Sequence, residues 1–216
     1  MTSEILADPP IRRRYRGASP AERQAARCRK LIEAGLALFG TAGYANSPVK
    51  SICGEAGLTE RYFYESFANR EELFAALYEH VVQEIGVLMV NALEAVPEDA
   101  DLRARALLEA YFGKIEADRA FARVLLLEVL GVSEYVHQTY LDAMARFTGL
   151  VERHVRPAFA DEARMQQESI VAAGLVGAIV HVAMRWVISD YATPRDQVIE
   201  GLMTIFTATA ARDRGL

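Results

Sequence analysis

Cysteine and the sequence motifs of catalysis are both scarce in this 216-residue chain. The two cysteines, Cys28 and Cys53, lack the spacing of a zinc site, and we interpret them as reduced core residues of a cytosolic protein. No nucleophile elbow, phosphate-binding loop or metalloprotease helix motif is present. His80 and Glu84 stand one helical turn apart and could share a metal ion, but the sequence places no third ligand beside them. These absences argue against an enzyme, and neither a cofactor nor a metal is expected.

Strand signals are also nearly absent, because the chain has no sustained alternation of apolar and polar residues and no Asn-Gly or Asp-Gly hairpin. Apolar residues instead recur every three to four positions, which predicts a long helix from Arg70 to about Ala95 that ends before Pro97. The chain is therefore expected to be all-α. Further helices are predicted over 101–117, 119–131, 134–156, 162–190 and 195–211.

The chain as a whole lacks the excess of positive charge that favours nucleic-acid binding: its net charge is −5 and its pI is about 5.5. Residues 10–70 nevertheless hold eleven Lys and Arg against five acids, a net charge of +6 that leaves −11 for the rest. Such a basic N-terminal part suits phosphate attraction. Residues 1–11 lack the basic start and apolar core of a signal peptide. A basic arm precedes the first predicted helix and either contacts DNA or is a leader of incidental charge: Arg12, Arg13, Arg14 and Arg16.

The segment 47–73 is the most specific signal in the sequence. Ser47 followed by Pro48 predicts a helix N-cap with proline at the first helical position. Gly57 can adopt the left-handed conformation that ends this short helix, and Thr59 can cap the next one. These features predict two short helices joined by a tight turn.

A third helix follows at once, because Asn69 and Glu72 have the spacing of a capping box. Three closely spaced helices with a glycine turn outline a helix-turn-helix unit, whose second helix enters the major groove of DNA. The sequence thus predicts a DNA-binding head.

This segment resembles the DNA-binding half of the TetR family of one-component regulators. The resemblance covers about residues 25 to 80 and implies an all-α fold: an N-terminal three-helix helix-turn-helix domain and a larger C-terminal helical domain for ligand binding and dimerisation. The sequence departs from the family at Ser66, where histidine is common, and Glu60 and Glu65 make the recognition helix acidic. The resemblance rests on Phe39, Gly43-Tyr44, Ala56-Gly57-Leu58-Thr59, Tyr64, Phe67 and Asn69-Arg70-Glu71-Glu72-Leu73.

Candidate DNA contacts follow from residue chemistry. Arg61 is the expected base reader, because its guanidinium fork fits the O6 and N7 atoms of guanine. Arg70 lies at the first position of its helix, where a cation opposes the helix dipole unless a phosphate stands in front of it. The remaining candidates face phosphates or a thymine methyl group. The full set is Ser47, Lys50, Thr59, Arg61, Tyr62, Tyr64 and Arg70.

The larger part of the chain is predicted to dimerise and to bind a ligand. Residues 169–184 carry no formal charge and include Gly174 and Gly177, so this helix is expected to be buried on all sides. Together with the last helix it predicts a four-helix interface between two subunits, as the resemblance also implies; a core within one chain is the alternative. A pocket for a mainly hydrophobic effector is expected, mostly from the resemblance, at Tyr111, Phe112, Glu116, Leu126, Tyr140, Met144, Phe147, His181 and Arg185.

These observations predict three parts: a basic arm (1–19), a helix-turn-helix DNA-binding domain (20–68) and a helical ligand-binding and dimerisation domain (69–216). The resulting interpretation is a cytoplasmic, ligand-responsive repressor that binds a near-palindromic DNA operator as a homodimer, without a membrane. The alternative is a small-molecule binding or carrier protein whose acidic head has lost its affinity for DNA.

Overall fold

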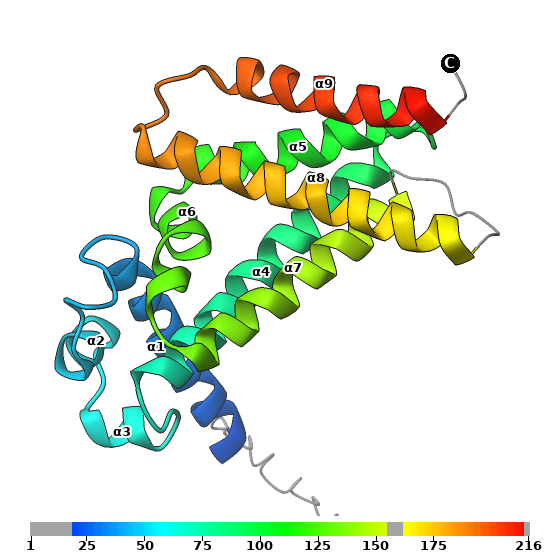
Figure 1. Ribbon diagram of the computed structural model, residues 1–216. Helices are drawn as coiled ribbons and strands as arrows, with labels where there is room; N and C mark the ends of the chain where they lie inside the picture. Colours follow the sequence, from blue (N-terminus) through cyan, green and yellow to red (C-terminus); the bar gives the residue numbers. More distant parts are fainter. Residues whose placement is uncertain (1–18, 155–161, 214–216) are drawn as a thin grey trace, which may run out of the picture.

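The computed structural model describes residues 19–154 and 162–213, and within these ranges the chain forms helices and no strand, which confirms the all-α class (Figure 1). The predicted arginine arm lies outside the described ranges. The helices are α1 (Pro20–Phe39), α2 (Val49–Ala56), α3 (Glu60–Tyr64), α4 (Arg70–Glu94), α5 (Ala100–Ala117), α6 (Arg119–Leu126), the short 3-10 helix η1 (Glu128–Gly131), α7 (Glu134–His154), α8 (Glu162–Ile188) and α9 (Arg195–Asp213).

Helices α1 to α3 form a small head at one end of the molecule (Figure 1). Its first helix begins with a complete capping box, in which Ser19 and Glu22 satisfy each other's backbone N–H groups. Leu31 and Phe39 of α1, Ile52 of α2 and Phe63 of α3 are fully buried. These apolar side chains hold three short helices together that would be marginal in isolation.

Helix α4 starts in the head and continues into the larger domain, where it packs against α5 and α7. Its capping box is half of the predicted one: Asn69 accepts from the backbone N–H of Glu72, but the Glu72 carboxylate accepts from the N–H of Ala68 rather than that of Asn69. Helices α8 and α9 lie across the far end of the molecule, where α9 packs mainly on α5 (Figure 1). Two helices thus cap a domain whose central rod is α4.

The helix predicted over 119–131 is interrupted. Helix α6 ends at Leu126, and a 3-10 turn carries Glu128 into contact with the head. The other predicted boundaries agree with the structure within two residues, apart from the end of the helix predicted over 134–156, which lies outside the described ranges. In residues 119–131, tertiary contact rather than local periodicity determines the backbone conformation.

Two stretches of the described chain are long and apolar enough to cross a membrane, namely α4 and residues 169–188 of α8. Helix α4 is the core helix of the domain, with half of its most apolar window buried. The corresponding window of α8 is only 28% buried, so an apolar face of α8 remains uncovered in the single chain.

Candidate nucleic-acid interface and effector cavity

The turn between α2 and α3 has the predicted geometry. Gly57 adopts φ 63° and ψ 34°, a left-handed conformation that favours glycine. The backbone N–H of Leu58 donates to the carbonyl of Cys53 at 2.9 Å and closes the end of α2. Buried Ile52 and Phe63 fix the two helices on the core, so that the outer side of α3 faces solvent.

Five of the predicted DNA contacts lie on the surface of the head: Lys50, Thr59, Arg61, Tyr62 and Tyr64. Tyr64 is 58% exposed, which leaves its phenol free to reach a phosphate. Thr59 occupies the N-cap position of α3, but its side chain makes no capping hydrogen bond. The surface thus offers a cation and hydroxyl groups around a short exposed helix.

Glu65, which directly follows α3, is partly neutralised within the head. Arg61 is 83% exposed at its side chain, and its Nε donates to the carboxylate of Glu65 at 2.9 Å. Arg27 of α1 approaches the same carboxylate at 3.7 Å, and its guanidinium lies 4.7 Å from the ring centre of Tyr62. Glu65 therefore meets two arginines rather than facing the solvent as a free charge. Sequence reasoning missed this network because Arg27 lies on another helix.

Ser47 and Arg70 are the two candidates whose side chains bind the protein's own backbone instead of facing solvent. Ser47 is 1% exposed, and its hydroxyl donates to the carbonyl of Gly43 at 2.8 Å, so Pro48 rather than Ser47 is the N-cap of α2. Arg70 is half-buried, and its Nη1 donates to the carbonyls of Tyr44 and Ser47 at 3.0 and 2.9 Å. Its guanidinium also covers the Tyr44 ring. Both side chains fix the loop between α1 and α2 instead of facing a phosphate.

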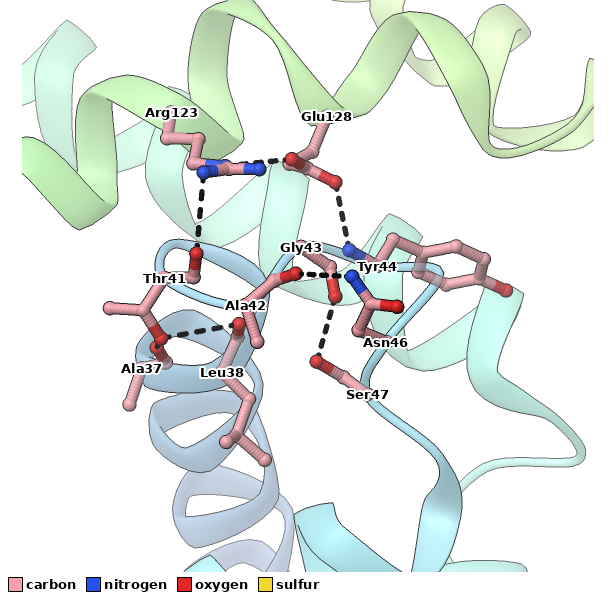
Figure 2. Close-up of polar contacts among 10 residues, drawn as sticks. All are labelled: Ala37, Leu38, Thr41, Ala42, Gly43, Tyr44, Asn46, Ser47, Arg123 and Glu128. Carbon is pink, nitrogen blue, oxygen red and sulfur yellow. Dashed lines mark hydrogen bonds and ion pairs between the residues drawn. The ribbon is translucent and has the colours of Figure 1, made fainter.

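The same loop is held against the larger domain by a polar clasp (Figure 2). Glu128 accepts from the backbone N–H of Tyr44 at 2.8 Å and from Arg123 Nε at 2.8 Å. Arg123 Nη1 donates to the carbonyl of Thr41 at 3.2 Å. The Arg123–Glu128 ion pair therefore binds the backbone of the loop at two residues. The sequence offered no signal for it, because the partners are more than 80 residues apart.

Gly40 allows the head and the larger domain to approach each other closely. A Cβ atom at this position would lie 2.5 Å from the Cβ and 2.6 Å from the Cα of Ala120 in α6. Gly43, with φ 87°, passes beside the Arg123–Glu128 pair, and a side chain there would meet both groups. The loop after α1 and the helix α6 are thus in direct backbone-to-backbone contact.

The larger domain encloses a small apolar cavity of about 30 Å³, enough for one or two water molecules. Among the described side chains that surround it, Tyr111 alone carries a hydroxyl group. Helices α4, α5, α7, α8 and α9 all contribute to its wall. The lining consists of Met89, Ala104, Leu107, Leu108, Tyr111, Phe147, Val151, Val176, Ile179, Val180 and Phe206.

The predicted effector residues divide into two groups. Tyr111 and Phe147 line the cavity, while the buried or half-buried Phe112, Leu126, Tyr140 and Met144 pack in the core around it. The structure does not bring Glu116, His181 and Arg185 to this cavity, because all three are exposed. Glu116 forms an ion pair with Arg195 at 2.7 Å, whereas His181 and Arg185 lie on the outer face of α8.

Apart from His181 and Arg185, that outer face of α8 is apolar, and the described chain leaves it open. Ile170 and Ile188 are 69% and 67% exposed, and a Cβ added at Gly174 or Gly177 would meet nothing within 4 Å. On α9, exposed Ile205 and the open Gly201 present a similar surface. Small and apolar residues therefore line both helices on sides that the described chain does not cover.

The metal site considered for His80 and Glu84 is not supported by the geometry. Glu84 is bound by Lys114 at 2.7 Å, and the described residues contain no cluster of three potential ligands. The two cysteines are free, Cys53 being buried and Cys28 half-buried.

The head and its turn decide the family. Residues 31–77, which contain α2, α3 and the start of α4, match the model of the TetR family of bacterial regulatory proteins. The chain is therefore a regulator with a TetR-type DNA-binding head. It is a ligand-responsive transcriptional regulator of the TetR type, a family of transcription regulators rather than enzymes. TetR-family regulators are soluble proteins that bind DNA and small-molecule effectors, usually as dimers.

Relatives of this TetR-family regulator cover most of its length. The transcriptional activator FasR of Mycolicibacterium smegmatis is 26% identical over 183 residues, which cover 80% of this chain and 77% of the relative. The fatty acid degradation regulator FadR of Bacillus halodurans shares the fold with a TM-score of 0.69 and 16% identity, covering 82% of this chain and 96% of the other. FadR of Bacillus subtilis in complex with stearoyl-CoA has a TM-score of 0.64 and 18% identity, with the same shares covered.

Proposed function

We propose that this regulator is a homodimeric repressor that binds a near-palindromic operator and is released by an effector with a long acyl chain. The observation that carries the proposal is the connection between two sites: a surface-exposed recognition helix and an apolar cavity, joined through α4 and the clasp on α6. Such a protein acts where its DNA is, so we expect a cytoplasmic location and no membrane partner.

The uncovered faces of α8 and α9 support the homodimer. Exposed isoleucines with glycines between them would let a second copy approach closely, and burial of this apolar surface is favourable at about 25 cal/mol per Å². Exposed His181 and Arg185 lie along the same face and would meet the partner. Two recognition helices related by a two-fold axis then read half-sites about 34–36 Å apart or a multiple of that distance.

The cavity supports an apolar effector. A hydrophobic wall suits a hydrocarbon chain, and a solved neighbour of this fold holds stearoyl-CoA. Ligand pockets usually measure about 300–1,000 Å³, so a cavity of 30 Å³ must open roughly tenfold or more to admit such a chain. Opening has to move the helices that line the cavity, and α4, which carries the head, is one of them.

The clasp offers a second route to the head. Cavity-lining Tyr111 lies in α5, and α6 follows α5 after the single residue Asp118. Helix α6 touches Gly40, while Arg123 and Glu128 hold the loop after α1. An effector that binds the open cavity more tightly than the closed one shifts the population towards heads out of register with the operator.

We propose that the protein represses transcription, although the relative FasR is named an activator. Repression and activation both require binding to the operator, and they differ in where the operator lies relative to the promoter. A reporter gene fused to the selected operator separates them: expression that rises when the regulator gene is deleted supports repression, whereas expression that falls contradicts it.

Selection of random DNA duplexes by the purified protein at two salt concentrations tests the proposal. We expect enrichment of a near-palindrome and an affinity that falls steeply with salt. Lys50→Ala should reduce the salt slope by about one, whereas Arg153→Ala, an equal loss of charge at the far end of α7, should leave it unchanged. A folded dimer that selects no sequence would contradict the proposal.

The carrier alternative rests on Glu60 and Glu65, whose charges would repel phosphates. The network around Glu65 weakens that argument, because Arg27 and Arg61 both approach its carboxylate. Glu65→Gln provides the comparison. If acidity alone abolishes DNA binding, the variant binds DNA and the wild type does not; if the wild type already binds a selected operator, the carrier alternative fails.

A further inference from the structure

Among the described residues, two buried side-chain polar atoms make no hydrogen bond: Arg27 Nε in the head and the hydroxyl of Tyr78 in the core. Tyr78 of α4 is fully buried, and its hydroxyl makes no hydrogen bond to any described residue. Buried tyrosine hydroxyls usually find a partner, and a buried group left without one destabilises the fold. The ring is explained by the core around α4, but the hydroxyl is not. A phenylalanine would fill the same space without that cost.

Tyr78 is one of three phenols from three helices. Burial raises its pKa, and the neighbouring Tyr111 of α5 and Tyr140 of α7 raise it further. Tyr111 itself is buried, with a raised pKa for the same reason, and it lines the apolar cavity. The three phenols are therefore neighbours, and the raised pKa values of Tyr78 and Tyr111 keep these two hydroxyls neutral donors at physiological pH.

Beside this cluster the charges cancel. Glu79 and Arg146 join α4 to α7 through two hydrogen bonds of 2.8 and 3.0 Å at the surface. At the fully buried Tyr78, Arg146 lowers the pKa and Glu79 raises it, so the two charges of this pair oppose each other. A ligand anion would lose its hydration here with no unpaired cation in return, whereas a neutral acceptor loses much less.

From this geometry we propose that Tyr78 is the hydrogen-bond donor that recognises the carbonyl oxygen at the root of a long acyl chain, whose tail fills the apolar cavity. The inference rests on the proposed function and names the part of the effector that the protein reads. Tyr111, at the cavity wall, completes the polar end of the site. A saturated chain without a carbonyl would leave the Tyr78 hydroxyl unpaired.

The separation of the two ends of the site fits a long chain. Met89 lines the cavity, and Tyr78 lies 11 residues earlier on the same helix, about 16 Å away at 1.5 Å per residue. Because Tyr111 lines the cavity and neighbours Tyr78, a chain that extends from the Met89 end of the wall passes Tyr111 before it meets the Tyr78 phenol. As the cavity opens, its growth toward Tyr78 would bring the orphan hydroxyl into contact with the ligand.

The test compares palmitoyl-CoA with S-hexadecyl-CoA, a thioether of nearly the same length and the same head that lacks the carbonyl. Binding is measured by calorimetry on the full-length dimer, and operator release by fluorescence anisotropy. Wild type should bind palmitoyl-CoA about five- to tenfold more tightly than the thioether, which is the effect of one buried neutral hydrogen bond. Tyr78→Phe should bind the two equally. Palmitic acid serves as a third probe: because it is a carboxylate anion at neutral pH, tighter binding than palmitoyl-CoA would overturn the inference of a neutral acceptor.

Tyr191→Phe is the matched control, because it removes a hydroxyl that is already satisfied. The Tyr191 hydroxyl donates to the carbonyl of Ile115 at 3.1 Å. Its loss should lower the melting temperature by about 2–4 °C and leave the preference for palmitoyl-CoA intact. Tyr78→Phe should melt at the wild-type temperature or above it, since it removes an unpaired polar atom from the core.

The outcomes separate the inference from the proposed function. If wild type binds both CoA ligands equally and both release the operator, the acyl effector stands and the role of Tyr78 is wrong. A Tyr78→Phe variant that keeps the preference also overturns it. If none of the three probes binds, the acyl effector itself fails, and the inference with it, while operator selection still decides whether the protein is a DNA-binding regulator.

Discussion

Gly40 is the position where a single methyl group should separate the head from the larger domain. Its backbone lies in the right-handed helical region, with φ −71°, so alanine is compatible with the local conformation. The added Cβ would lie 2.5, 2.6 and 2.7 Å from the Cβ, the Cα and the carbonyl oxygen of Ala120. Two of these neighbours are backbone atoms, which have no rotamer with which to yield. The end of α1 must therefore move away from α6.

The size of the effect follows from two opposing contributions. Overpacking of a tight contact costs about 1–3 kcal/mol. The loss of glycine flexibility in the unfolded chain returns about 0.4–1 kcal/mol. We expect Gly40→Ala to be less stable by about 1–2 kcal/mol, which is roughly 2–8 °C in melting temperature for a chain of this size. Because the strain is relieved when the head shifts, affinity for the operator should fall about fivefold or more.

Thermal unfolding and operator affinity, both measured without effector, check the prediction. Gly86→Ala is the control, because Gly86 lies within α4 and a Cβ there would meet nothing within 4 Å. That variant should be equally stable or more stable, by up to about 1 kcal/mol, through the better helix propensity of alanine. The reasoning would be refuted if Gly40→Ala matched the wild type in both stability and operator affinity.

Three further predictions follow from other contacts. Arg70→Lys keeps the charge but loses the hydrogen bonds to the loop, so the melting temperature should fall while the salt slope of DNA binding stays constant; a change in the slope alone would restore the phosphate role. Gly177→Arg should give a folded monomer in light scattering with weakened operator affinity, and an intact dimer would contradict the proposed interface. Burial, Arg103 and Arg153 lower the pKa of His154. The unfolded chain therefore binds a proton more readily below pH 6.5, and denaturant titrations should show stability falling there less steeply in His154→Gln.

Much of the fold was predictable because the signals for helices are local. The apolar repeat of α4, the glycine turn at Gly57 and the prolines between helices act within a few residues, and the structure follows them closely. Residues 119–131 are the exception. There the chain leaves the helix so that Glu128 can accept the N–H of Tyr44, and no local pattern records a partner so distant in the sequence.

The positions of some functional residues could not be predicted, because the same sequence pattern fits both a site-facing and a different environment. The α8 segment is apolar on both faces, so its periodicity does not tell which side meets the core, and His181 was assigned to the cavity although it faces outward. Ser47 before Pro48 has the composition of an N-cap, yet its hydroxyl finds the carbonyl of Gly43 in the preceding loop. Arg70 was predicted to need a phosphate, and the loop carbonyls meet that need instead. Each error concerns a partner that the fold supplies.

The Gly40 contact also tests whether the cavity and the head are coupled. Tyr111 and Ala120 belong to consecutive helices, so a path from the cavity to the head exists, but adjacency alone does not establish energetic coupling. If the effector releases DNA by moving α6 away from the head, the Gly40→Ala variant already has α6 and the head partly separated before the effector binds. The effector should then weaken DNA binding by a smaller factor in the variant than in the wild type, because two changes that act on one element are not additive. Equal factors would mean that the signal travels through α4 without the clasp.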